Sequence, residues 1–255
     1  MSTNDALFSF IEQLQAGTPW ESVLDAGTGS HSLEWISGLP TSRWTGVTGE
    51  ARVADRLRRE FSSVMRPVDR IACGDWSDPL FLQGETFSVV VADYLLGALD
   101  GFAPYFQDRL FERLRRHVGT RMYVVGLAPY PGSSDHPWGQ VVVEVARLRD
   151  ACILLAGHRC YREYALDWTL RQLEAADFVV EETRVFPIRY GLPFVDEQLD
   201  VCLRKLPSFR DQRLAASMRR SVESLRERAH SLHAIHRGAS FGEDYVVYAR
   251  PRPRD

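Results

Sequence analysis

Short apolar runs followed by an acidic residue recur in the first hundred residues of this chain of 255. Asp25 ends the run over residues 22–24, Asp75 follows residues 70–73, and Asp93 ends the run over residues 87–92. Carboxylates accept hydrogen bonds from ammonium, amino and hydroxyl groups, most strongly from charged donors. Acids placed where strands end can therefore hold a polar or cationic ligand at one edge of a sheet.

Two glycines, Gly27 and Gly29, come directly after Asp25, and an amphipathic segment over residues 33–39 follows them. This order is typical of the strand, tight turn and helix that open a nucleotide-binding crevice. Glycine serves such a turn by adopting backbone angles that a Cβ forbids and by letting a ligand approach the main chain. A Gly-x-Gly pair also occurs in turns that bind nothing, so the rest of the chain must support the interpretation.

The elements that must position these residues alternate between strands and helices. Apolar runs predict strands over residues 22–24, 44–48, 70–73, 87–92, 121–127, 178–186 and 245–249. Apolar residues at helical spacing predict helices over residues 5–16, 33–39, 53–64, 106–117, 141–155, 166–176 and 214–232. The regular alternation in the first half predicts an α/β fold with a doubly wound, parallel sheet.

Composition narrows the class of protein. The formal net charge is −3 and the hydrophobic fraction is 45%, which are ordinary values for a globular protein and give no general attraction for nucleic acid. No stretch reaches the roughly 20 apolar residues that span a bilayer, and the polar N-terminus does not resemble a signal peptide. The four cysteines are scattered without a Cys-x-x-Cys pair, which indicates reduced thiols. We expect a cytoplasmic protein that binds neither nucleic acid nor membrane.

The motifs taken in order resemble those of class I S-adenosylmethionine-dependent methyltransferases. The residues that carry the resemblance are 23–29, 73–76 and 87–93, together with a closing pair of strands over 178–183 and 244–250. The resemblance implies a mainly parallel, seven-stranded Rossmann-like sheet with a final antiparallel strand. It also implies S-adenosylmethionine as the cofactor and methyl transfer as the activity.

The resemblance assigns roles to the residues at the strand ends. Asp25 would hold the ammonium group of the cofactor, and Asp75 would accept from the adenine amino group beside a flat wall formed by Trp76. Asp93 and Tyr94 would border both the methionyl part and the acceptor. The glycine turn would face the methionyl part and the ribose. The expected cofactor-binding residues are Asp25, Ala26, Gly27, Thr28, Gly29, Thr48, Glu50, Asp75, Trp76 and Asp93.

One position departs from the family pattern. The family usually has an acid at the end of the second strand that binds the ribose hydroxyls, and here that position holds Thr48. Glu50, two residues later, is the substitute candidate, and a surface glutamate at a helix start is the alternative interpretation. A dinucleotide dehydrogenase would prefer a third glycine where Ser32 stands, so that class is disfavoured.

Three residues are candidates for the catalytic chemistry. His136 follows the fifth strand and titrates near neutral pH, so it could act as a general base. Tyr94 could line the acceptor pocket, and His158 lies in a polar, aromatic connector over residues 157–164. The alternatives are a solvated loop histidine for His136, a packed ring for Tyr94 and a capping connector for His158.

The late part of the chain contains an insertion over residues 191–240, between two strands that a short hairpin often joins. It is expected to be helical and to serve as a lid or a homodimer surface, or simply to pack on the core. Its histidines His230, His233 and His236 do not share one helix face, so a solvated face is expected and no metal site.

These observations predict a single methyltransferase domain over residues 1–255, with an N-terminal helix over residues 1–20 and the insertion over 191–240. The expected reaction transfers a methyl group from S-adenosylmethionine to an oxygen or nitrogen of a small-molecule acceptor. Modification of a protein or peptide side chain is one alternative. A non-catalytic module that binds the cofactor is the other.

Overall fold

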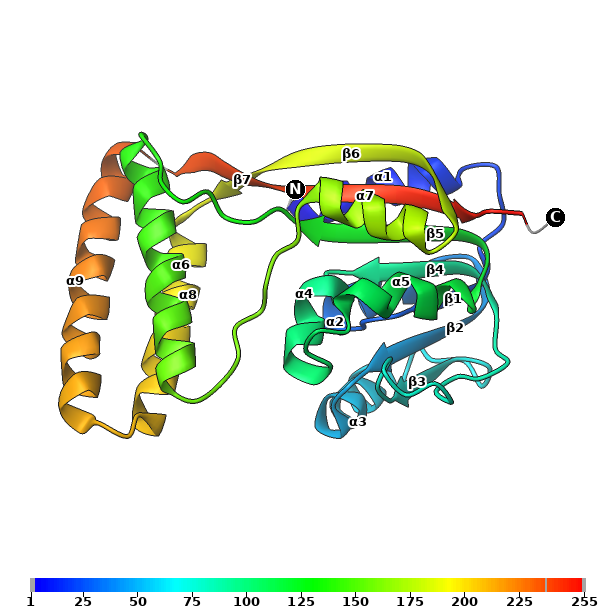
Figure 1. The fold of residues 1–255 in the computed structure, drawn as a ribbon, viewed down its shortest axis with the longest axis horizontal. Coiled ribbons are helices and arrows are strands. Elements are labelled where there is room, and N and C mark those ends of the chain that lie inside the picture. Colours follow the sequence, from blue (N-terminus) through cyan, green and yellow to red (C-terminus); the bar gives the residue numbers. More distant parts are fainter. Residues whose placement is uncertain (1–2, 237, 254–255) are drawn as a thin grey trace. The chain divides into compact units, whose positions relative to one another are not determined.

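The computed structural model describes residues 3–236 and 238–253 and contains a seven-stranded sheet with helices on both faces (Figure 1). The strands are β1 (Glu21–Asp25), β2 (Thr41–Thr48), β3 (Arg70–Cys73), β4 (Phe87–Asp93), β5 (Val118–Leu127), β6 (Phe178–Tyr190) and β7 (Ala239–Pro251). The helices are α1 (Thr3–Gln15), α2 (Ser30–Ser37), α3 (Ala51–Glu60), α4 (Leu95–Phe102), α5 (Gln107–Arg115), α6 (Pro137–Leu155), α7 (Leu166–Ala175), α8 (Leu192–Lys205), a short 3₁₀ turn (Leu206–Ser208) and α9 (Gln212–His236).

The strand order is β3-β2-β1-β4-β5-β7-β6. β1 pairs in parallel with β2 and β4, β2 with β3, and β4 with β5, whereas β7 runs antiparallel to β5. The predicted doubly wound, mainly parallel sheet with an antiparallel final strand is therefore confirmed. Successive strands are added on one side of β1 up to β3 and on its other side from β4 onward, so the strand order reverses between β1 and β4. In open α/β sheets ligands bind at such a point, outside the carboxyl ends of the strands.

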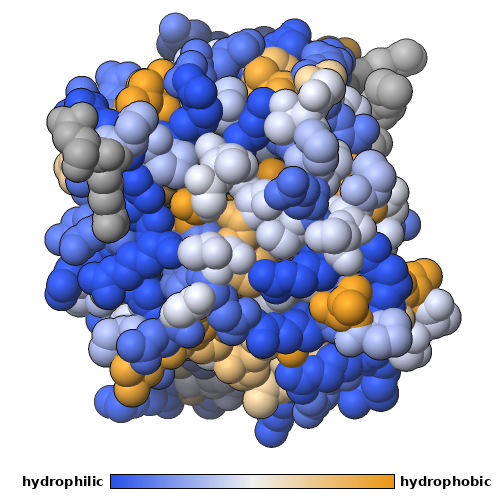
Figure 2. All heavy atoms as spheres, turned by 90° about the vertical axis from the view of Figure 1, so that its right-hand side faces the viewer, coloured by the Kyte–Doolittle hydropathy of each residue, from blue (hydrophilic) through white to orange (hydrophobic). Residues whose placement is uncertain are grey.

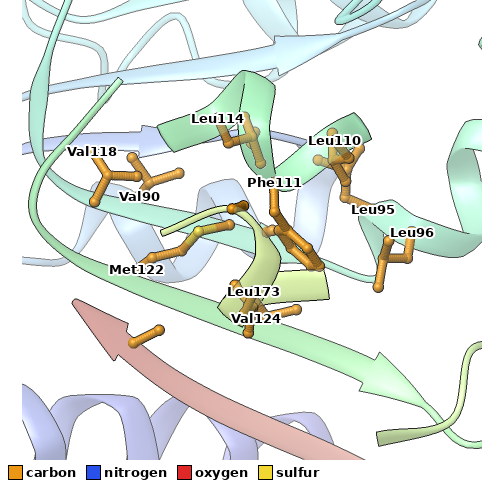
Figure 3. Close-up of a cluster of buried hydrophobic side chains, with 14 of the residues drawn as sticks. Val90, Leu95, Leu96, Leu110, Phe111, Leu114, Val118, Met122, Val124 and Leu173 are labelled. Carbon is orange, nitrogen blue, oxygen red and sulfur yellow. The ribbon is translucent and has the colours of Figure 1, made fainter. Parts of the chain in front are cut away.

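Alternate residues of the central strands pack against different helices. On one face, Val90, Met122 and Val124 contact a cluster that includes Phe111 of α5 and Leu173 of α7 (Figure 3). On the other face, the neighbouring strand residues join a second cluster with α1, α2 and α3, and its members from β4 and β5 are Val89, Val91, Tyr123 and Val125. Burial of both faces explains why β4 reads as a continuous apolar run in the sequence.

The residues form two compact units. The first comprises residues 1–128, 162–186 and 244–255, and the second comprises residues 129–161 and 187–243. The insertion expected over residues 191–240 lies in the second unit, which also takes in α6. Both β6 and β7 are longer than predicted: β6 continues beyond residue 186 and β7 begins before residue 245, in each case through residues that belong to the second unit.

The second unit is built around α6, α8 and α9, which pack against one another (Figure 1). Trp138 at the start of α6 is fully buried, and its indole Nε1 donates to the carbonyl oxygen of Tyr190 at 2.8 Å. Val195 and Leu199 of α8 and Ala229 of α9 are also fully buried. The apolar stripe of the long helix is therefore a packing surface within its own unit.

An ion pair fixes the start of β2 in the first unit. The Arg66 guanidinium donates to both carboxylate oxygens of Asp69, and the distance to each is 2.8 Å. The same arginine donates to the Thr41 carbonyl, while Asp69 accepts from the backbone N–H of Trp44 at 3.0 Å. Burial alone would raise the pKa of Asp69, but these hydrogen bonds and the charge of Arg66 outweigh it and lower that pKa.

On the face drawn in Figure 2, hydrophobic side chains form small patches among hydrophilic ones. Isolated patches of this kind are normal on folded proteins. Within the part of the chain that the structure describes, no helix combines the length and the apolar character needed to cross a membrane.

Candidate active site

The turn between β1 and α2 is held on both sides by neighbouring strands. The Ala26 N–H donates to the Val91 carbonyl at 2.8 Å, and the Thr28 N–H donates to the Val47 carbonyl at 2.7 Å. The indole Nε1 of Trp76 donates to the Ala26 carbonyl, also at 2.7 Å. These three bonds fix the main chain of the turn at the carboxyl edge of the sheet.

The two glycines of this turn are not needed for their backbone angles. Neither has a positive φ, and Gly29 has φ −136° and ψ 178°, which other residues also adopt. The expectation that this turn needs glycine for its backbone angles is therefore wrong at both positions. The second expectation still fits Gly29, since a Cβ there would have no atom within 4 Å and the space beside the main chain is open. A Cβ on Gly27 would lie 2.9 Å from Leu95 Cδ1, so that glycine allows close packing.

Asp25 is buried at the end of β1 without hydrogen-bond partners. The residue is 1% exposed, and neither carboxylate oxygen makes a hydrogen bond of normal geometry to a described residue. Burial raises the pKa of Asp25, and contacts with Thr28, Ser32 and the Gly27 backbone oppose this shift only in part. The Thr28 hydroxyl is also buried and, apart from this contact with Asp25, makes no hydrogen bond to a described residue. Buried polar groups normally have partners, so these atoms indicate a ligand.

Two further carboxyls lie at the same edge. Asp93 ends β4, and the register places Asp244 of β7 opposite Leu127, the last residue of β5. Burial, and then the charges of Asp25 and Asp244, raise the pKa of Asp93 to about 7. Burial raises the pKa of Asp244 to about 6, although a hydrogen bond from Tyr94 opposes this shift. The sequence did not single out Asp244, because only the antiparallel register of β7 brings it to this edge.

Tyr94 has a strained backbone directly after Asp93. Its φ of 46° and ψ of 21° lie in the left-handed region, and its N–H donates to the Val125 carbonyl at 3.0 Å. Strained residues of this kind cluster at functional sites, where the surrounding structure maintains them. The Tyr94 side chain contacts Asp244 through the hydrogen bond described above, so this predicted residue lies within the group of carboxyls.

Thr48 and Glu50 lie where the ribose contact was expected. Thr48 is buried at the end of β2, and its hydroxyl accepts from the Glu50 N–H at 3.4 Å. Glu50 is exposed and immediately precedes α3. The structure therefore leaves Glu50 as the residue with a free carboxylate at this strand end, and its contact with ribose stays a prediction.

Asp75 and Trp76 differ in exposure. Asp75 is half-buried, and one of its carboxylate oxygens accepts from the Ser77 N–H at 2.8 Å. Trp76 is only 3% exposed and its ring packs edge-on against Phe81, with 5.3 Å between the ring centroids. The indole therefore supports the turn through Ala26, and this burial does not favour the predicted role as a flat wall for adenine.

His136 and His158 belong to the second unit. His136 precedes α6 and its Nδ1 accepts from the Trp138 N–H at 3.2 Å, so it caps the helix. The ring of His136 also lies against His236, with 5.1 Å between centroids. Nδ1 of His158 lies 3.3 Å from the Lys205 ammonium nitrogen. Both histidines thus have structural partners within their own unit, and their catalytic roles stay predictions.

The three histidines of α9 have separate neighbours. His230 bonds to Asp196 at 3.1 Å, His233 lies against the Trp138 ring, and His236 lies against His136. Over residues 3–236 and 238–253, no group of three or more histidine, cysteine or acidic side chains could hold a metal ion.

Comparison with known proteins shows the fold. No family model and no curated protein sequence matches the chain. Among solved structures, a SAM-dependent methyltransferase from Methanosarcina mazei matches with a TM-score of 0.57 and 14% identity, over 96% of this chain and 98% of that one.

Two other structures show the range of chemistry on this fold. The [4+2]-cyclase SpnF matches with a TM-score of 0.60 and 15% identity, over 98% of this chain and 81% of that one. A phosphoethanolamine N-methyltransferase from Haemonchus contortus, in complex with phosphomonomethylethanolamine and S-adenosylhomocysteine, matches with a TM-score of 0.53 and 12% identity, over 98% of this chain and 53% of that one. The chain therefore has the fold of the S-adenosylmethionine-dependent methyltransferases.

Proposed function

We propose that this protein binds S-adenosylmethionine and transfers its methyl group to an oxygen or nitrogen of a small-molecule acceptor. The observation that carries the proposal is the unpartnered, buried Asp25 carboxylate beside the open main chain at Gly29. Both lie at the edge of the sheet where open α/β folds bind ligands. The neighbours that carry the same fold include two named methyltransferases, one of them crystallised with the demethylated cofactor.

The residues present fit this cofactor. Asp25 would hold its ammonium group and so gain the partner that it lacks, and the Thr28 hydroxyl would bond to its polar atoms. Gly29 would admit it to the main chain, while Asp75 and Glu50 would accept from its adenine and ribose groups. The bound cofactor would supply an electrophilic methyl group on a sulfonium. The residues of the chain would bind it, align the acceptor and exclude water.

A small acceptor, a cytoplasmic location and a homodimer are parts of the same proposal. The acidic net charge disfavours a nucleic-acid substrate. The cyclase among the structural neighbours shows that this fold also serves other reactions. A module that binds the cofactor without methyl transfer is therefore a second candidate.

Calorimetry with S-adenosylhomocysteine tests the proposal. We expect the wild-type protein to bind it with a micromolar Kd, and the Asp25→Asn variant to bind at least about tenfold more weakly, since a charge-assisted contact contributes about 1.5–3 kcal/mol. Asp55→Asn is the matched control, because Asp55 is exposed and pairs with Arg58 on α3. Absence of binding to the wild-type protein would refute the proposal. Binding without methyl transfer to any member of a diverse acceptor collection would favour the second candidate.

A further inference from the structure

The group of carboxyls at the edge of β4 and β5 holds more negative charge than the cofactor alone can balance. Asp25, Asp93 and Asp244 meet within the first unit, and the charges of Asp25 and Asp244 act directly on Asp93. Among the described residues, no lysine, arginine or histidine lowers the pKa of any of these three carboxyls. Buried charges without partners of opposite sign are costly and normally belong to a binding site.

A second observation is that this group contains buried oxygens without hydrogen-bond partners among the described residues. Asp25 is 1% exposed, neither of its oxygens has a described partner, and its charge reaches Asp93. One oxygen of Asp93 is likewise buried without a partner. Asp244 is 4% exposed and accepts a hydrogen bond from Tyr94, whose backbone has left-handed angles. The unpartnered oxygens of Asp25 and Asp93 therefore indicate that a ligand supplies hydrogen-bond donors to this group.

Charge counting indicates the nature of the second donor. The cofactor carries a sulfonium, an ammonium and a carboxylate, so it adds one net positive charge. When all three carboxyls are ionised, two negative charges stay in excess with a neutral acceptor, and an anionic acceptor would add to the repulsion. An acceptor that arrives as a protonated amine adds a second positive charge and several N–H donors.

We propose that Asp244, with Asp93 and the Tyr94 hydroxyl, binds the acceptor as a protonated amine at the carboxyl edge of β4 and β5, so that nitrogen receives the methyl group. This inference rests on the proposed function and narrows its choice between oxygen and nitrogen. Asp244 would be the residue that determines this specificity, because it lies at the sheet edge on β7 and has no assigned contact with the cofactor.

Asp93 would accept the proton that the ammonium nitrogen must lose before it can receive the methyl group. The ammonium gives one proton to a carboxylate oxygen of Asp93, which frees the nitrogen lone pair. That pair forms the bond to the methyl carbon while the carbon–sulfur bond breaks, and its electrons stay on sulfur as a neutral thioether. The product nitrogen then carries the positive charge. A pKa of about 7 for Asp93 suits it to accept this proton at neutral pH.

The test compares amines with alcohols of matched shape in the presence of S-adenosylhomocysteine. The probes are ethanolamine, benzylamine and tryptamine against ethylene glycol, benzyl alcohol and tryptophol, measured by calorimetry at neutral pH. We expect the amine of at least one pair to bind about tenfold or more tightly than its alcohol. The preference should decrease as the pH falls below about 6, because Asp244 becomes protonated there. Asp244→Asn should abolish it, whereas Asp55→Asn, which alters an exposed pair, should retain it.

Several outcomes would overturn the inference while S-adenosylhomocysteine still binds. They are equal or tighter binding of the alcohols, no binding of any amine at millimolar concentration, and an unchanged amine preference in Asp244→Asn. If Asp244→Asn does not fold, Tyr94→Phe gives the same test, since it removes the hydroxyl that bonds to Asp244. Failure of the wild-type protein to bind S-adenosylhomocysteine would instead refute the proposed function, and the inference with it.

Discussion

Replacement of Asp93 by asparagine should stabilise the ligand-free protein at alkaline pH. The pKa of Asp93 rises from 3.8 to about 7, mainly through burial and then through the charges of Asp25 and Asp244. A shift of about three units corresponds to about 4 kcal/mol, because each unit is about 1.4 kcal/mol. The ionised carboxyl therefore lowers the free energy of unfolding by an amount of this order.

The sign of the pH dependence follows from the raised pKa. The native state holds the proton of Asp93 more tightly than the unfolded chain does. The protonated carboxyl therefore adds its full contribution to the free energy of unfolding below the unfolded pKa near 4, and this contribution is lost as the pH rises through about 7. An asparagine carries no charge at any pH, but its buried amide needs partners and offsets about 1–3 kcal/mol of the gain. We expect a net stabilisation of about 1–3 kcal/mol at about pH 8 and none at about pH 5.

Urea unfolding of the wild-type protein and Asp93→Asn at these two pH values measures the difference. Thermal unfolding should show the same trend, with about 2–4 °C per kcal/mol for a chain of this size. Asp55→Asn serves as the control, since Asp55 is exposed and paired with Arg58. If Asp93→Asn were less stable than the wild type at the higher pH, or differed from it equally at both pH values, the explanation from buried like charges would be wrong.

Three further changes test the placement of the site and the contacts that stabilise the first unit. Gly29→Ser should alter stability by no more than about 0.5 kcal/mol, because its Cβ has open space and serine is a favoured residue at the N-cap of α2. It should nevertheless weaken the binding of S-adenosylhomocysteine in calorimetry, and unchanged affinity would contradict the placement of the site. Asp69→Ala should cost about 1–3 kcal/mol in urea unfolding at neutral pH, because it leaves the buried N–H of Trp44 without an acceptor and removes the ion pair with the exposed Arg66. The loss should diminish below about pH 4 as the lowered pKa of the wild-type carboxyl is approached. Trp76→Phe should cost about 1–2 kcal/mol and also reduce cofactor affinity, because the bond to the Ala26 carbonyl is lost; an effect on stability alone would show that the indole does not position the turn.

Local patterns were sufficient for most elements of the first unit. The strand predicted over residues 70–73 coincides with β3, and the run over residues 87–92 lies within β4. Apolar runs and helical spacing record which side chains leave water, and this depends mainly on neighbouring residues. In contrast, α4 was not predicted, since its glycines, Gly97 and Gly101, and its short length conceal the helical pattern.

The candidate site was predictable where each residue follows its own strand. Asp25 and Asp93 end β1 and β4, and parallel strands bring their carboxyl ends to one edge. The role of His136 as a helix cap and the burial of Trp76 could not be foreseen, because each depends on where a side chain meets a distant backbone atom or core.

The sequence by itself determined the order of strands and helices and two of the acids at the sheet edge, because these depend on short-range periodicity. Only the tertiary structure decided that Asp244 joins them, since the antiparallel register of β7 on β5 places it opposite Leu127. That register arises from pairing between distant segments and the burial of alternate side chains in two cores. The excess of buried negative charge at this edge is therefore a property of the folded chain.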